Sequence, residues 1–168
     1  ITLNRLAHKL RDKRFKDGAI NFDREEVRFE IDPNGKPIRV YFKNAKDANK
    51  LVEEFMLLAN RTVAESVGKV KKGEKVKTLP YRIHDLPDSN KLDNLASIAS
   101  RFGFRLVTVG KKTDVAKSLN KLLADVHGNR IQNLIENVSL RAMQKARYST
   151  YNIGHYGLGF DYYTHFTS

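Results

Sequence analysis

The side chains best suited to chemistry lie at the end of the chain, in residues 154–168. The segment reads GHYGLGFDYYTHFTS and holds three glycines, two histidines and five aromatic rings. Glycine lets a backbone turn tightly or approach a ligand closely, and aromatic rings either pack in a core or stack on planar bases. Hydroxyl and imidazole groups suit ribose and phosphate oxygens. By composition alone, the segment is either an aromatic core or a nucleotide-contacting surface.

The sequence does not indicate a site for metal-assisted hydrolysis. Cleavage of a phosphodiester near neutral pH needs an activated water and positive charge near the reacting phosphorus, and magnesium held by clustered carboxylates supplies both. The acidic residues of 23–26 and the pair Glu53–Glu54 are adjacent in sequence, and neighbours on a strand or helix point apart. No two histidines have the spacing of a helical metal-binding pair; they are His8, His84, His127, His155 and His165.

A helix expected over residues 45–67 carries a second set of candidates. Apolar side chains at helical spacing predict a broad buried face; they are Ala48, Leu51, Val52, Phe55, Leu58, Ala59, Thr62 and Val63. Beside that face, Asn49, Glu53, Met56 and Asn60 recur at intervals of four and three, so they share one flank. If the flank is buried its polar groups need partners, which a bound ribose could supply. If it faces water, it is an ordinary helix boundary.

Two separated stretches resemble the ribonuclease II and ribonuclease R family of exoribonucleases, closest to the bacterial ribonuclease R branch. The run His155-Tyr156-Gly157-Leu158, followed by YTHFTS at 163–168, is similar to the family's C-terminal signature, which continues as Pro-Ile-Arg-Arg. The stretch NKLVEEFMLLAN at 49–60 is similar to a second family segment. Shorter matches occur at 18–22 and 80–85. The resemblance covers nearly the whole chain and is weakest at 68–78 and 104–113.

The resemblance implies a fold and an activity. The fold is α+β: a helix-rich part of the RNB catalytic domain with a short antiparallel hairpin, spanning residues 1–168 and truncated at both ends. The activity is processive, magnesium-dependent 3′→5′ hydrolysis of single-stranded RNA to nucleoside 5′-monophosphates. In this family the magnesium-binding aspartates lie upstream of Ile1 and a catalytic arginine follows Ser168. We therefore expect this chain to supply the RNA channel and to be inactive alone.

The resemblance also assigns RNA-contacting residues. Phe22 stands where the family has a ring against the 3′-terminal base, with Phe29 as the alternative if the alignment needs a one-residue gap. By spacing alone, Phe22 fits a core position equally well. Glu53 matches a glutamate that contacts a sugar near the cleavage site, and a carboxylate that accepts from a 2′-hydroxyl favours RNA over DNA. The other implied contacts are Asn49, His155, Tyr156, His165, Thr167 and Ser168.

Periodicity predicts the elements that must position these residues. Apolar residues three and four apart predict helices, over residues 2–15, 45–67, 90–102, 113–126 and 129–146. Alternation predicts short strands, over residues 19–22, 27–31, 38–42, 81–84 and 104–109. The turn signal Asp32-Pro33-Asn34-Gly35 joins the second and third strands into a hairpin.

Composition narrows the class of protein. The 168 residues include 31 Lys and Arg against 19 Asp and Glu, a net charge of +12, which favours a polyanionic partner such as nucleic acid. Cysteine is absent, so disulfides and thiolate metal sites are excluded. No apolar run has the ~20 residues of a membrane span. We expect one cytoplasmic, monomeric domain piece with no membrane partner.

Two other functions remain open from sequence. The first is a basic RNA-binding module without catalysis, which a missing aspartate cluster upstream of Ile1 would favour. The second is a helix-turn-helix DNA reader built on the two helices between Thr113 and Ala146. Its turn at Gly128 is weak support, because such turns join helix hairpins in general.

Overall fold

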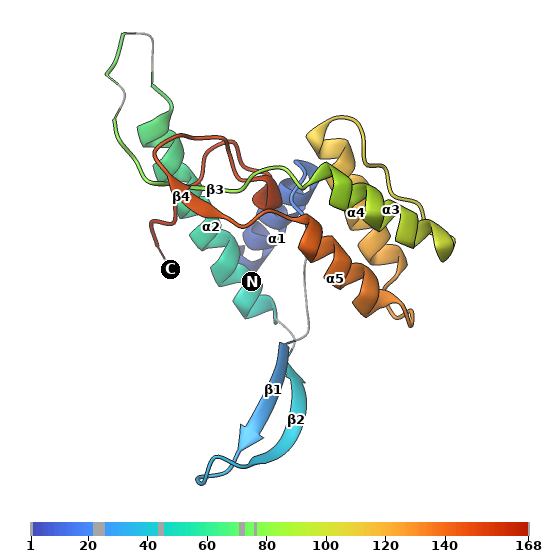
Figure 1. The fold of residues 1–168 in the computed structure, drawn as a ribbon. Helices are drawn as coiled ribbons and strands as arrows, with labels where there is room; N and C mark the ends of the chain where they lie inside the picture. Colours follow the sequence, from blue (N-terminus) through green and yellow to red (C-terminus); the bar gives the residue numbers. More distant parts are fainter. Residues whose placement is uncertain (1, 22–25, 44–45, 71–72, 76, 168) are drawn as a thin grey trace.

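The computed structural model describes residues 2–21, 26–43, 46–70, 73–75 and 77–167 (Figure 1). Phe22 and Ser168 therefore lie outside the described residues. The helices are α1 (Thr2–Lys16), α2 (Asp47–Gly68), α3 (Ser89–Arg101), α4 (Lys112–Asp125), α5 (Gln132–Ala142) and the single 3₁₀ turn η1 (Tyr156–Leu158). The strands are β1 (Glu26–Ile31), β2 (Pro37–Lys43), β3 (Tyr81–Ile83) and β4 (Arg147–Ser149). The predicted helix-rich α+β fold is confirmed.

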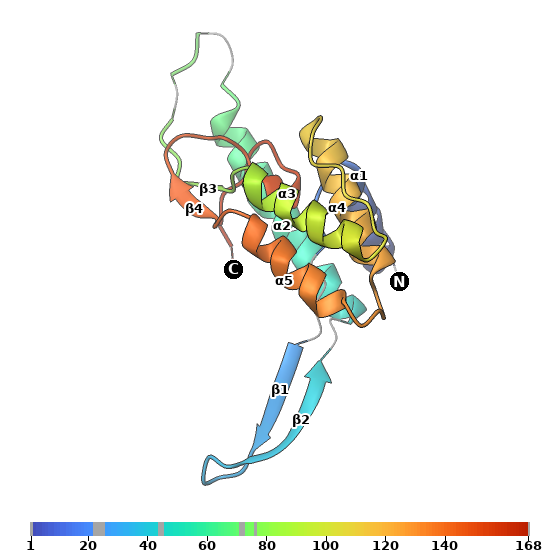
Figure 2. The same ribbon diagram turned by 45° about the vertical axis from the view of Figure 1, so that its right-hand side comes forward.

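The predicted hairpin is confirmed as β1 and β2, which project from the helical body in both views (Figures 1 and 2). The Asp32 carboxylate closes the turn by accepting hydrogen bonds from the backbone N–H groups of Asn34 (2.9 Å) and Lys36 (2.8 Å). Along the strands Phe29 faces Val40, and both side chains are more than half exposed. The hairpin therefore forms locally, from its turn, and not by burial in the body.

Helices α3, α4 and α5 surround one apolar core. Leu95, Leu119 and Ile135, one from each helix, have no exposed surface. The Asp88 side chain caps α3 by accepting from the backbone N–H of Lys91, as its position before the helix predicts. Gly128, with φ of +75°, connects α4 to α5. This packing accounts for the Gly128 turn as a connection between core helices.

A buried ion pair joins α1 to α2. Arg14 is 6% exposed and Glu54 is 3% exposed. The Arg14 Nε lies 3.2 Å from both Glu54 carboxylate oxygens, Nη2 contacts Oε1, and Arg11 Nη1 lies 3.6 Å from the same oxygen. A buried charge is tolerated only when it is paired, and removing one partner typically costs about 3–5 kcal/mol. The pair therefore holds the two helices in a fixed register.

Asn60 of α2 ties the C-terminal segment to the helices. Its side-chain oxygen accepts from the backbone N–H groups of Phe166 (3.0 Å) and Thr167 (2.8 Å). Its NH₂ group donates to the Thr167 carbonyl (3.1 Å) and to the Tyr163 hydroxyl (3.3 Å). Asn60 is only 2% exposed, so one buried amide satisfies backbone groups that no regular secondary structure pairs.

The structure corrects the predicted buried face of α2. The residues that are buried are Glu54, Leu57, Asn60 and Ala64, whereas Val52 is 55% exposed and Leu58 is 39% exposed. The inward side is set by the Arg14 ion pair and by the bonds of Asn60, which are polar contacts. A count of apolar residues cannot detect them.

Two predicted strands and the predicted end of one helix were also wrong. Residues 19–21 are not a strand, because Asn120 binds their backbone: its NH₂ donates to the Ala19 carbonyl and its oxygen accepts from the Asn21 N–H. Residues 104–109 are not a strand either; the N–H of Val107 donates to the Ser118 hydroxyl. Helix α5 ends at Ala142, not 146, because the chain turns there toward β4.

Among the described residues, no helix is both long and apolar enough to cross a bilayer.

Replacing Asn60 tests the tie between α2 and the C-terminal segment. We expect Asn60→Ala to lower the free energy of unfolding by about 1–3 kcal/mol, because buried backbone partners lose their bonds. Asn94→Ala, at an exposed position within α3, is the control and should change it by less than about 0.5 kcal/mol. Urea unfolding measures both; equal effects would contradict the role of Asn60.

Candidate functional site

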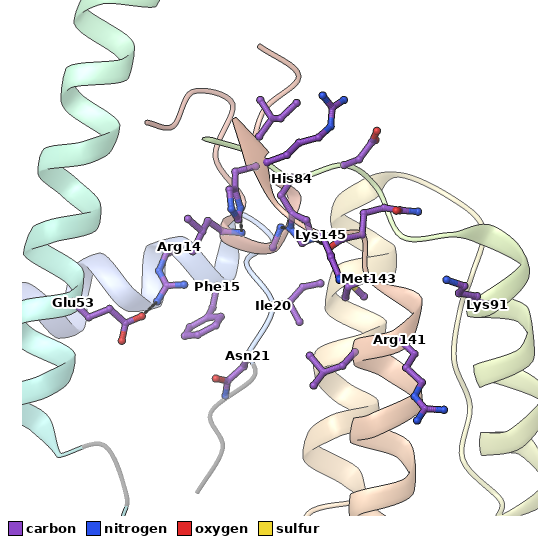
Figure 3. Close-up of a pocket in the computed structure, with 18 of the residues that line it drawn as sticks. Arg14, Phe15, Ile20, Asn21, Glu53, His84, Lys91, Arg141, Met143 and Lys145 are labelled. Carbon is purple, nitrogen blue, oxygen red and sulfur yellow. Dashed lines mark hydrogen bonds and ion pairs between the residues drawn. The ribbon is translucent and has the colours of Figure 1, made fainter. Parts of the chain in front are cut away.

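A cleft of about 1270 Å³ separates α1 and α2 from α5 and the start of α3. Figure 3 shows Glu53 and Arg14 on one side and Lys91 and Arg141 on the other. His155 also lines the cleft, on the chain segment that links the two sides. The cleft thus brings together a carboxylate, an imidazole and several cations from distant parts of the sequence.

Positive charge predominates in the cleft. Its cationic side chains are Arg11, Arg14, Lys91, Arg141, Lys145 and Arg147, and its acidic ones are Glu53 and Asp85. Four of these cations are exposed and come from α3, α5 and the stretch that follows α5 into β4. We call them the basic wall; they are Lys91, Arg141, Lys145 and Arg147. A hollow lined mainly by one sign of charge concentrates ligands of the opposite sign. The cleft is therefore suited to a polyanion.

Glu53 is held by a neighbouring guanidinium. The Arg14 Nη2 lies 3.6 Å from Glu53 Oε1, and the Nε of the same guanidinium donates to the buried Glu54. The Glu53 side chain remains 50% exposed. Glu54 therefore fixes Arg14. Glu53 lines the cleft, and its exposed carboxylate can accept hydrogen bonds from a ligand.

Glu53 also borders a second hollow of about 500 Å³, which we call the α2-flank pocket. Asn49, Met56 and Asn60 line it together with Glu53, so the flank predicted from spacing does share one surface. The C-terminal segment supplies the rest of the lining, which includes Tyr163, His165 and Thr167. Glu53 thus stands between the cleft and this pocket.

The ring of His84 joins three segments of chain. Its Nε2 lies 2.8 Å from the Gln144 carbonyl, and its Nδ1 accepts from the backbone N–H of Gly157 at 2.8 Å. Only a neutral ring with its proton on Nε2 can make both bonds. Burial lowers the pKa of His84 below its usual value, more than the bond to Gln144 raises it. A Cβ at Gly157 would lie 2.8 Å from Nδ1, so this close approach requires glycine.

His155 is neutral for similar reasons. Its Nδ1 accepts from the Leu158 N–H at 3.2 Å, and its ring centre lies 4.9 Å from that of His84. Burial lowers the pKa of His155 to about 3, and the nearby His84 adds to the shift. The proton therefore resides on Nε2, for which no hydrogen-bond partner is found among the described residues. His155 is therefore a lining residue of the cleft whose Nε2–H keeps its capacity to donate.

Three other predicted site residues, Tyr156, Asn49 and Phe29, have different surroundings. Tyr156 is 8% exposed and belongs to the helical core; burial raises its pKa to about 12, and its hydroxyl lacks a partner within the described part of the chain. The Asn49 side chain accepts from the backbone N–H of Lys46 at the start of α2. Phe29, the alternative to Phe22, is 57% exposed on the hairpin and does not line the cleft.

Sequence reasoning missed the groups that support the site. Arg14 was one of several cations on α1, and His84 one residue in a short family match. Asn60 lay on the correct flank, but its bonds to the C-terminal segment required the tertiary structure. The only signal for Arg14 was its place near the end of the helix expected over residues 2–15.

The described residues do not form a metal site. No group of three or more His, Asp or Glu side chains in this part of the chain comes together in a way that could hold an ion. That magnesium is bound by residues outside this chain stays a prediction.

Comparisons with known proteins show which domain and which proteins the chain resembles. Residues 1–168 match the RNB domain family. Ribonuclease R of Aquifex aeolicus is 35% identical over 159 residues, covering 93% of this chain and 21% of that protein. Ribonuclease R of Thermotoga maritima is 37% identical over 166 residues, covering 97% and 22%. The chain thus spans about a fifth of the length of these relatives.

Solved structures share the fold. Mycoplasma genitalium RNase R in complex with ribose-methylated single-stranded RNA is 26% identical, with a TM-score of 0.80 over 99% of this chain and 25% of that one. Yeast Ssd1, a pseudonuclease, has a TM-score of 0.65 at 18% identity, covering 99% of this chain and 20% of Ssd1. The second likeness shows the fold alone.

The neutral histidines predict a pH dependence of stability. The unfolded chain takes up protons on histidine below about pH 6.5, but folded His155 resists protonation down to about pH 3. The free energy of unfolding should therefore fall as pH drops from 6.5, by at most about 1.4 kcal/mol per pH unit for each histidine. His155→Asn should reduce that slope between pH 7 and 5, and Asn94→Ala, which removes no titratable group, should not. Equal slopes in all three proteins would contradict the assignment.

Proposed function

The chain belongs to the RNB domain family, and we propose that it is the RNA-gripping part of a 3′→5′ exoribonuclease that hydrolyses single-stranded RNA. The observation that carries the proposal is the cleft that Glu53 and His155 line together with the basic wall. These groups come from α2, the C-terminal segment, α3, α5 and the stretch that follows α5 into β4. Their convergence supports one ligand that carries both ribose hydroxyls and phosphates.

The basic wall suits the phosphate backbone. Lys91, Arg141, Lys145 and Arg147 have long, exposed side chains that can follow a flexible strand without reading its sequence. Each neutralised phosphate releases counterions, which strengthens binding at low salt. Processive degradation requires this kind of grip, because the strand must slide after each cleavage.

Glu53 suits the ribose. Its carboxylate only accepts hydrogen bonds, so it can take one from a 2′-hydroxyl, which DNA lacks. Arg14 restrains the side chain, and the buried Glu54 restrains Arg14 in turn. A pre-positioned acceptor loses less entropy on binding than a free side chain. The Nε2–H of His155 is a donor suited to a phosphate or hydroxyl oxygen in the same cleft.

Hydrolysis itself is assigned to groups beyond the described residues. A divalent ion activates water and stabilises the charge that develops on phosphorus, and the family resemblance implies magnesium. The described side chains do not fit such an ion. Their part is to bind the strand and to orient the sugar through Glu53. We therefore propose that residues 1–168 do not cleave RNA by themselves.

The alternative function is a basic RNA-binding module without catalysis. The same cleft and basic wall would serve it, since neither depends on the metal. The two functions differ only in whether the bound strand is shortened.

Incubation of the full-length protein with 3′- and 5′-labelled single-stranded RNA separates them. We expect nucleoside 5′-monophosphates released stepwise from the 3′ end when magnesium is present, and none from residues 1–168 alone. Binding without shortening would favour the module. Cleavage within the strand, or action on duplex DNA alone, would reject the proposal.

Glu53→Gln tests the ribose contact. A carboxylate bond to a hydroxyl contributes about 1.5–3 kcal/mol, so the variant should lose about tenfold or more of the preference for RNA over an oligonucleotide with 2′-deoxy sugars at its 3′ end. Asp125→Asn, on α4 outside the cleft, is the control. Competition binding measures the preference, and an unchanged preference in Glu53→Gln would remove Glu53 from the ribose site.

The basic wall predicts a change in salt dependence. Replacing Arg141 and Lys145 by Gln should weaken RNA binding without changing base preference. The slope of log affinity against log salt should fall by about 0.7 for each phosphate that the variant no longer neutralises. Lys36→Gln, in the exposed hairpin turn, should leave the slope unchanged. If the double variant has the same slope as the unaltered protein, Arg141 and Lys145 do not contact the phosphates.

A further inference from the structure

The outer face of the β3–β4 sheet carries an exposed ring beside a guanidinium. Arg82 of β3 stands directly opposite Tyr148 of β4. Tyr81 and Ile83, the neighbours of Arg82, are buried on the inner face, so Arg82 points outward. Its Cζ lies 4.7 Å from the centre of the Tyr148 ring, and that ring is 55% exposed. The core does not require a large exposed ring at this position.

The same face lies next to the α2-flank pocket, and His165 connects the two. The backbone N–H of Arg82 donates to the Tyr163 carbonyl at 2.9 Å, so the C-terminal segment lies beside β3. From that segment, the His165 Nδ1 lies 3.4 Å from the Tyr148 hydroxyl, and His165 lines the α2-flank pocket. A strand that leaves the pocket past His165 therefore meets Tyr148 next.

We propose that Tyr148 and Arg82 form a stacking site for one base of the RNA, adjacent to the α2-flank pocket. This rests on the proposed function, since it extends the same RNA-binding surface. A base stacks on an aromatic ring or on a guanidinium plane regardless of its identity. Arg82 also brings a positive charge next to the neighbouring phosphate, and its contact with the ring holds both groups in place before RNA binds.

The site differs from the cleft in its chemistry. The cleft offers cations to phosphates and Glu53 to a sugar, whereas Tyr148 offers a flat apolar surface to a base. The Tyr148 hydroxyl, in contact with His165, orients the ring but is not needed for stacking. Removal of the hydroxyl and removal of the ring should therefore have different consequences.

Binding of the full-length protein to a series of single-stranded RNAs, each with one abasic nucleotide, tests the site, with EDTA added to stop hydrolysis. We expect one abasic position to weaken binding by the unaltered protein about tenfold. Tyr148→Ala should weaken binding of intact RNA about tenfold and should no longer respond to that abasic position. Tyr148→Phe should bind like the unaltered protein. Tyr151→Ala, which removes a tyrosine that is 82% exposed three residues later, is the matched control and should have no effect.

Tyr148→Ala binding as tightly as the unaltered protein, or retaining the full response to every abasic position, would overturn the site. Equal losses in Tyr148→Ala and Tyr151→Ala would overturn it as well. If Tyr148→Ala unfolds at a lower temperature, Arg82→Gln and Tyr148→Leu are measured with the same RNAs. Both should bind intact RNA more weakly and lose the response to the abasic position, and unchanged binding by both would overturn the site. Failure of the unaltered protein to bind single-stranded RNA at all would instead reject the proposed function.

Discussion

A buried amide, that of Asn60, is the constraint on which the rest of the molecule depends. The C-terminal segment has few regular backbone partners, yet it must lie beside α2 for the α2-flank pocket to exist. Asn60 supplies two acceptor and two donor contacts to that segment. At the other end of the segment, the neutral ring of His84 binds Gly157 and Gln144. Two buried polar side chains thus fix an irregular segment that hydrophobic packing alone would leave without a unique path.

The adjacent carboxylates of α2 divide two tasks between them. Glu54 is buried and neutralises Arg14, and this pair sets the register of α1 against α2. Glu53 is half exposed, and the same guanidinium restrains it from one side. Structural and ligand-facing groups therefore share one cation. Changes at Arg14 would alter both the packing of the helices and the presentation of Glu53, which is why Glu53 is the better position at which to separate binding from folding.

Local signals in the sequence predicted the hairpin and all five α-helices, because these depend on turn residues and on periodicity within one segment. The convergence of Glu53 with the C-terminal histidines was inferred only from family resemblance. The inward side of α2 was predicted wrongly, because its partners Arg14 and Tyr163 are polar and distant in sequence. The strand expected at 104–109 failed for a related reason: alternation was present, but its hydrogen bond goes to Ser118 on a helix. Pairing between distant segments is decided by tertiary contacts that no single segment contains.

The central claim is that α2 and the C-terminal segment together hold the 3′ end of an RNA strand. The most direct measurement is photo-cross-linking of the full-length protein to single-stranded RNA with 4-thiouridine at its 3′ terminus, followed by mass-spectrometric mapping of the linked peptides. The account predicts cross-links in the peptides that contain Glu53 and residues 155–167. Cross-links confined to the β1–β2 hairpin or to the outer surfaces of α3 and α4 would contradict it.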